Sequence, residues 1–108
     1  MKESDLKDAL SGILPTARSA FTDEMDPPYI IYMPTDRSKG INADDAVAAR
    51  GIPWRIELYS QRILSDVEKQ IEDTLDALGI IWNSDETFIP DEKMRIKYYF
   101  FEEWWERE

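Results

Sequence analysis

Hydrophobic residues recur at helical spacing in two segments of the chain. In residues 2–14 the apolar positions follow the three- and four-residue spacing of one helical face, and Pro15 ends the segment because proline cannot continue a helix. Residues 65–78 show the same spacing. Their predicted buried stripe consists of Val67, Ile71, Leu75 and Leu78. Both segments are therefore expected to be amphipathic helices.

The ends of the second helix are marked by residues that commonly cap helices. Ser65 and Glu68 have the spacing of a capping box, in which each side chain accepts a free backbone N–H of the first turn. Gly79 follows the last apolar position, where a left-handed glycine often terminates a helix. The helix is therefore predicted to begin at Ser65 and to end just before Gly79.

Alternating and continuous apolar runs predict the strands. The three clearest strands are at residues 29–33, 54–60 and 94–105, and shorter ones are expected at residues 17–21 and 80–82. Asn83, Ser84 and Asp85 favour turns and are expected to end the last short strand. Residues 34–53 are rich in turn-forming residues and predict one long flexible loop.

The order of these elements predicts one domain. At 108 residues the chain is too short for two separate cores, so residues 1–108 are expected to form a single α/β domain with its long loop at residues 34–53. The predicted class is α+β. It consists of a small mixed or antiparallel β-sheet of about four strands packed with two α-helices, in the order α-β-β-α-β-β.

One face of the predicted sheet is expected to pack on the second helix. The residues assigned to that face are Trp54, Ile56, Leu58, Met94, Ile96, Tyr98 and Phe100. The residues assigned to the opposite face are Arg55, Glu57, Arg95 and Lys97, followed by the aromatic Tyr99, Phe101 and Trp105. Two interpretations of this second face stay open: the N-terminal helix folds over it, or its aromatic part is exposed and forms an interface.

Composition removes most catalytic chemistry. The sequence has no cysteine and no histidine, which excludes thiolate nucleophiles and removes the commonest general base and transition-metal ligand. The four glycines are isolated, so no glycine-rich phosphate loop is present. The acidic pairs at residues 44–45 and 91–92 lack the ligand pattern of a calcium loop. An enzyme is therefore not expected, and no catalytic, cofactor-binding or metal-binding residue is predicted.

The chain is strongly acidic, with 23 acidic and 13 basic residues and a formal net charge of −10. Such a chain should be repelled by the phosphates of DNA unless its few cations cluster. The charge fits a surface past which DNA slides, a surface that imitates DNA, or simple solvation. The sequence has no apolar run of about 18 residues, so no membrane partner is expected.

Several segments of the sequence resemble one family. They are Tyr29-Ile30-Ile31-Tyr32, Asn42-Ala43-Asp44-Asp45, Trp54-Arg55-Ile56-Glu57-Leu58-Tyr59-Ser60, Gly79-Ile80-Ile81-Trp82, Phe88-Ile89-Pro90-Asp91-Glu92-Lys93-Met94 and Tyr98-Tyr99-Phe100-Phe101-Glu102. Together they span residues 28–102 and resemble the tail terminator, or tail completion, proteins of siphophages and prophages. The chain differs from the family at Gly51-Ile52-Pro53, where relatives continue a longer strand, and Pro53 is expected to interrupt pairing or to lie at a sheet edge.

The resemblance implies a structural role in a viral tail. Proteins of this family are α/β folds that form a homohexameric ring on the head-proximal end of the tail tube, where the ring stops tube polymerisation and provides the surface that joins the head. The implied partners are further copies of this chain, the major tail tube protein and a head-completion or connector protein, while DNA passes through the lumen without specific binding. The implied location is the virion tail, assembled in the cytoplasm of the bacterial host.

Candidate contact residues come from two regions of the sequence. Contacts between subunits or with the tail tube are expected from Tyr99, Phe101, Trp104 and Trp105. Contacts made by the long loop are expected from Asp36, Arg37, Lys39 and Asp44. Two other functions stay open: another neck or head–tail joining protein, and an acidic inhibitor that mimics DNA by presenting its carboxylates on one face.

Overall fold

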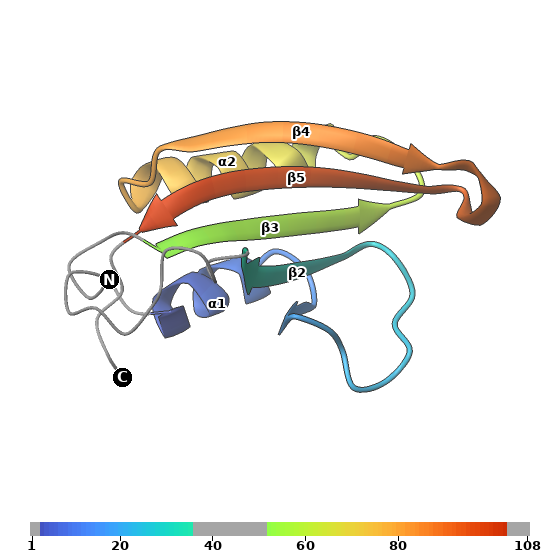
Figure 1. Ribbon diagram of the computed structural model, residues 1–108, viewed down its shortest axis with the longest axis horizontal. Helices are drawn as coiled ribbons and strands as arrows, with labels where there is room; N and C mark the ends of the chain where they lie inside the picture. The colour runs from blue at the N-terminus through green and yellow to red at the C-terminus, as the bar shows by residue number, and fades with distance from the viewer. Residues whose placement is uncertain (1–2, 36–51, 104–108) are drawn as a thin grey trace.

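The protein is a two-layer α/β domain, with a mixed sheet in one layer and two helices in the other (Figure 1). The computed structural model describes residues 3–35 and 52–103. Helix α1 spans Glu3–Ser11 and helix α2 spans Ser65–Ala77. The strands are β1 (Thr16–Arg18), β2 (Tyr29–Pro34), β3 (Ile52–Ser60), β4 (Trp82–Ile89) and β5 (Met94–Glu103), and the 3-10 helix η2 (Pro90–Glu92) lies between the last two.

The sheet has the strand order β1-β2-β3-β5-β4, with β1 and β2 parallel and the other neighbours antiparallel. The prediction of a mixed α/β fold with two helices is confirmed. In the described residues the sheet has five strands rather than about four, and the element order is α-β-β-β-α-β-β. Strand β1 lies where the short strand was expected at residues 17–21, but it covers only Thr16–Arg18, whose three residues pair with β2.

Both helices lie on the same side of the sheet, α1 beside β2 and β3 and α2 beside β4 and β5 (Figure 1). Glu3 of α1 accepts hydrogen bonds from Arg18 of β1 (2.8 Å) and Tyr32 of β2 (3.2 Å), which fixes the helix to that edge. Helix α1 was expected to reach residue 14 but ends at Ser11, and Leu14 still packs against the core beyond the helix. Helix α1 therefore lies on the same side of the sheet as α2, the side on which Tyr99 and Phe101, assigned to the second face, are buried (Figure 1).

The core lies between the sheet and the two helices. Its buried members are Leu6, Leu10, Ile30, Tyr32, Trp54, Ile56, Leu58, Ile71, Leu75, Ile80, Tyr99 and Phe101. The predicted orientation of the apolar residues of β3 and the predicted stripe of α2 are both confirmed. Burial of each large apolar side chain stabilises the fold by about 1.5–3 kcal/mol, so this layer accounts for most of the hydrophobic stabilisation.

The assignment of faces on β5 was wrong. Tyr99 and Phe101 pack in the core against the helices, and Arg95 lies on the same side. Tyr98 and Phe100 therefore lie on the opposite side of the sheet, since side chains alternate along a strand. The physical reason is the acidic flank of α2, which offers carboxylates to the polar residues of β5 and so allows them to face the helix.

Helix α2 begins without the predicted capping box. Leu64 occupies the cap position and no side chain caps the helix. The Glu68 carboxylate accepts a hydrogen bond from Arg95 at 2.8 Å, so it is directed to the sheet rather than back to the first turn. The predicted end is confirmed: α2 stops at Ala77, and Gly79 has φ +76°, the left-handed conformation expected of a helix terminator.

Replacing Gly79 by alanine is expected to lower the free energy of unfolding by about 1 kcal/mol. A Cβ built at Gly79 would have no atom within 4 Å, so the whole cost comes from the positive φ. Gly12→Ala is the matched control, because a Cβ there would make an ordinary 3.5 Å contact with the backbone of Ala9. Urea denaturation that shows equal stability for the two variants would contradict the role given to Gly79.

The turn expected at Asn83, Ser84 and Asp85 was wrong, because β4 runs through these residues to Ile89. Six residues of β4 are exposed, and each residue of the strand has a partner in β5. Turn-forming residue types are tolerated here because the pairing with β5 fixes the backbone, and polar side chains suit an exposed edge strand.

Pro53 does not interrupt the sheet, contrary to expectation. It lies within β3, opposite Glu102 of β5. The N–H of Thr35 donates to the carbonyl of Pro53 (3.0 Å), so the backbone of Pro53 faces the β2 side of the strand. The missing N–H of proline falls just beyond Pro34, where β2 ends, and the pairing with β5 is unaffected.

Candidate interface on the helix-free face of the sheet

The side of the sheet opposite the helices is the candidate functional surface. We call it the helix-free face because no helix in the described part of the chain lies on it (Figure 1). Strand alternation and the pairing register place on it Tyr29, Ile31 and Met33 of β2, Arg55, Glu57 and Tyr59 of β3, and Met94, Ile96, Tyr98 and Phe100 of β5. Tyrosine, phenylalanine, methionine and arginine are the residue types enriched in protein interfaces.

The aromatic side chains of this face are arranged in two stacked pairs. Tyr29 and Tyr59 stack with ring centroids 4.8 Å apart, and Tyr98 and Phe100 stack at 5.8 Å. Phe21 adds an edge contact to Tyr29 at 5.4 Å. The stacking holds these rings in place, so a partner would meet a surface that loses little conformational entropy on binding.

A charged network lies at the centre of the face, between the two aromatic pairs. The Arg55 Nε atom is 2.8 Å from the Glu57 carboxylate, but its N–H does not point at the oxygen, so the contact is an ion pair rather than a hydrogen bond. Tyr59 donates a hydrogen bond to Glu57 at 2.7 Å. The Arg55 guanidinium also lies 3.2 Å from the sulfur of Met33 and 5.7 Å from the ring of Tyr98.

Glu57 is 5% exposed although no described helix covers it. The pairing register places it between Ile31 and Tyr98, and its carboxylate is shared by Arg55 and Tyr59. A buried carboxylate is tolerated only when it is paired and hydrogen-bonded, so these contacts lock the centre of the face. The helix-free face is thus a rigid surface with an internally neutralised centre and aromatic sides.

The phenol of Tyr59 makes the stability of the folded protein depend on pH in the alkaline range. Burial raises the pKa of Tyr59, and the hydrogen bond to Glu57 raises this pKa further. The tyrosines of the unfolded chain ionise near pH 10 whereas Tyr59 in the folded protein stays protonated, so the unfolded state is favoured as the pH rises above about 10. Tyr59→Phe should therefore lose less stability between pH 9 and about pH 11 than the wild type, as measured by urea denaturation at each pH. An identical decline in the two proteins would contradict this role.

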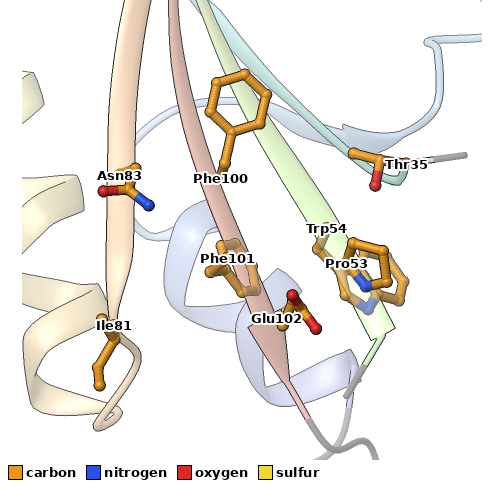
Figure 2. Close-up of a pocket in the computed structure, with 8 residues that line it drawn as sticks. All are labelled: Thr35, Pro53, Trp54, Ile81, Asn83, Phe100, Phe101 and Glu102. Atoms are coloured by element: carbon orange, nitrogen blue, oxygen red, sulfur yellow. The ribbon is translucent and has the colours of Figure 1, made fainter. Parts of the chain in front are cut away.

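A hollow of about 390 Å³ lies at one end of the sheet, beside Phe100 (Figure 2). Its described lining residues are Thr35, Pro53, Trp54, Ile81, Asn83, Phe100, Phe101 and Glu102. Figure 2 shows that the ring of Phe100 stands on the face away from α1, whose ribbon passes behind the sheet. Glu102 is the one titratable side chain among these lining residues, so the described part of the lining holds no acid–base pair, and we treat the hollow as the end of the helix-free face.

The residues predicted as contacts do not form this surface. Tyr99 is 0% exposed and Phe101 is 5% exposed, and both belong to the core, so neither side chain is available to a partner. Trp104 and Trp105 lie outside the described residues. Asp36, Arg37, Lys39 and Asp44 also lie outside them, as does the predicted loop apart from its ends, where Pro34 belongs to β2 and residues 52–53 belong to β3.

Two aromatic residues of the helix-free face, Tyr98 and Phe100, were assigned from the sequence to the face that packs on the second helix. Tyr98 and Phe100 alternate with Tyr99 and Phe101, so large rings occur on both faces of β5 and hydrophobicity alone could not choose between them. The sequence of the helix contains a signal for the orientation of β5, because the acidic residues Glu68 and Glu72 flank the buried Ile71. Their carboxylates bind Arg95 and Tyr99, respectively, each at 2.8 Å.

Among residues 3–35 and 52–103, no group of three or more acidic side chains could hold a metal ion. Within the same ranges, no helix has the length and apolar character needed to cross a membrane. No protein-family model, no curated protein and no solved structure matches this chain.

Proposed function

We propose that this chain is a structural subunit of a phage tail that assembles through its helix-free face and acts as a tail terminator. The observation that carries the proposal is the composition of that face, where three tyrosines, one phenylalanine and two methionines lie on the same side of the sheet as a paired arginine. Residues of these types dominate the energetics of protein interfaces. In this function the protein makes and breaks no covalent bond, and it acts by closing a ring on the end of the tail tube.

The segments that resemble the tail terminator family supply this face. Tyr29-Ile30-Ile31-Tyr32 lies in β2, residues 54–60 lie in β3, and Tyr98-Tyr99-Phe100-Phe101-Glu102 lies in β5. These three strands are neighbours in the sheet. The resemblance and the aromatic surface therefore concern the same part of the molecule, which supports an assembly role for that part.

The acidic helix gives less support to a DNA mimic. Three carboxylates of α2 are engaged by side chains of the sheet: Glu68 binds Arg95, Glu72 binds Tyr99 and Asp76 binds Trp82. A mimic of DNA needs carboxylates that are free to face a basic groove. Another neck or head–tail joining protein would use the same kind of surface, and the following experiment distinguishes it from a terminator.

The test is to add the purified chain to the polymerising tail-tube protein of the same phage or prophage and to measure tube lengths by electron microscopy. We expect the wild type to give short tubes with a ring at one end. Phe100→Glu, which places a charge on the helix-free face, should give tubes as long as those formed by the tube protein alone. Ile63→Glu should shorten the tubes as the wild type does. Ile63 is 64% exposed and precedes α2, so it provides the same substitution away from this face. Tubes of normal length in the presence of the wild type would contradict the terminator function.

A further inference from the structure

Strand β4 forms a long edge of the sheet, visible along the outer side of the sheet in Figure 1. It pairs with β5 through eight consecutive residues, without a bulge or a proline, and no strand in the described part of the chain lies on its other side. Natural edge strands are usually kept short, interrupted or charged, because their free N–H and C=O groups invite another strand. The opposite edge strand, β1, is short, with three residues, whereas β4 is long and uninterrupted and is protected only by the charges of Asp85 and Glu86.

The backbone groups that point outward from β4 can be identified from the hydrogen bonds of the sheet. Thr35 donates its N–H to the carbonyl of Pro53, so odd-numbered residues of β3 direct their backbone groups to β2 and even-numbered ones to β5. Continuing this alternation through the registers of β3, β5 and β4 leaves the backbone groups of Trp82, Ser84, Glu86 and Phe88 on the free edge.

One of these four edge donors is already occupied. The N–H of Glu86 donates to the carboxylate of Asp85 at 2.8 Å. This hydrogen bond agrees with the outward direction derived from the sheet register. The carboxylate of Asp85 must leave this N–H before an added strand can accept from it, so Asp85 controls access to the middle of the edge.

The charges of β4 disfavour a second copy of this chain as the added strand. Because residues opposite each other in an antiparallel pair direct their backbone groups the same way, the two longest registers of a β4–β4 pair place Asp85 opposite Asp85 or Glu86 opposite Glu86. Like charges that lie directly opposite each other destabilise strand pairing. The edge is therefore suited to a strand of different composition.

We propose that β4 accepts an extended, lysine- or arginine-bearing segment of another protein as an added strand. A cation opposite Asp85 attracts the carboxylate away from the N–H of Glu86, which makes that donor available to the incoming backbone. Main-chain hydrogen bonds then provide the affinity, and the cation provides the selectivity. This proposal rests on β4 alone and does not depend on the phage-tail function.

Two further features prepare the edge for such a partner. Glu86 binds Arg95 (2.9 Å) and Trp82 binds Asp76 of α2 (2.9 Å), so β4 is held to the rest of the fold and needs little ordering on binding. Phe88 is 55% exposed at the end of the strand and offers an apolar contact to the incoming segment.

The test uses three capped eight-residue peptides as probes, with β4 amides followed by NMR and by hydrogen exchange at low salt. One peptide alternates lysine and threonine, the second alternates glutamine and threonine, and the third is the lysine peptide with alternate amides N-methylated. We expect the lysine peptide to shift and protect the amides of Ser84, Glu86 and Phe88. It should bind about fivefold more tightly than the glutamine peptide, as expected for one or two exposed ion pairs. The N-methylated peptide should lose this binding.

Replacing Asp85 by alanine separates edge pairing from general charge attraction. In Asp85→Ala the N–H of Glu86 is free and the cation has no target, so the lysine and glutamine peptides should bind within about twofold of each other. Asp23→Ala removes one negative charge from the segment between β1 and β2, at the opposite edge of the sheet, and should keep the wild-type ratio. Three outcomes would overturn the proposal: undiminished binding of the N-methylated peptide, amide shifts confined to α2, or no change in β4 at millimolar peptide.

Discussion

Replacing Tyr99 by alanine should lower the free energy of unfolding by about 4 kcal/mol, the loss typical of a buried aromatic residue. Tyr99 is 0% exposed, and its ring meets that of Trp82 edge-on with centroids 5.4 Å apart. Its hydroxyl donates to Glu72 of α2 at 2.8 Å, so the substitution also leaves a carboxylate without this donor. The loss can be measured by urea denaturation followed by tryptophan fluorescence.

The neighbouring residue provides the control for this result. Tyr98 lies on the helix-free face and is partly exposed, so Tyr98→Ala should cost less than about 1.5 kcal/mol. The difference between the two variants measures which side of β5 faces the helices. If Tyr98→Ala were the more destabilising variant, Tyr98 rather than Tyr99 would face the helices. The helix-free face would then not contain Tyr98 and Phe100.

The second large effect is expected at Arg95, whose guanidinium joins α2 to β4. It binds Glu68 at 2.8 Å and Glu86 at 2.9 Å, and its side chain is 9% exposed. Arg95→Met would leave Glu68 nearly buried, with Lys97 at 3.8 Å as its remaining partner among the ion pairs of the described residues. Removal of one member of a buried ion pair typically costs about 3 kcal/mol or more.

The loss of stability in Arg95→Met should come from the uncompensated negative charge of Glu68 rather than from lost packing. The double variant Arg95→Met with Glu68→Leu removes both charges and should recover most of the lost stability. Lys69→Met is the control for an exposed pair, since the side chains of Lys69 and Asp73 are 75% and 61% exposed, and it should leave stability unchanged. A double variant as unstable as Arg95→Met alone would contradict this explanation.

The sequence predicted the fold where one face of an element is clearly more apolar than the other. The stripe of α2, the inward residues of β3 and the terminator Gly79 were identified because their neighbours are polar or small. Strand β5 offers no such contrast. It has Tyr98 and Phe100 on one face and Tyr99 and Phe101 on the other, so its orientation depends on which carboxylates α2 brings to Arg95.

Long-range pairing explains the other differences. The polar residues Asn83, Ser84 and Asp85 have the local preference of a turn, but β5 supplies a partner for each of them and the strand continues. Pro53 could be placed in a strand only once the end of β2 was known, because its missing N–H falls beyond Pro34. Neither fact can be obtained from local preferences, since both depend on where a distant segment ends.

The candidate surface depended on the same ambiguity. The sequence left open whether an aromatic face of the sheet is covered by the N-terminal helix or exposed for an interface, and Tyr99 and Phe101 were named as members of that face. The structure assigns these two residues to the core and leaves Tyr98 and Phe100 on the helix-free face. The presence of aromatic residues on both faces of β5 could therefore be seen in the sequence, but which of them the helices cover could not.

The most direct test of the assembly role is the native mass of the protein, measured by light scattering behind size exclusion over a wide range of concentrations. We predict that the wild type and Ile63→Glu form a concentration-dependent species of six subunits, and that Phe100→Glu remains a folded monomer. A six-subunit species formed equally well by Phe100→Glu, or a wild type that stays monomeric at every concentration, would contradict assembly through the helix-free face.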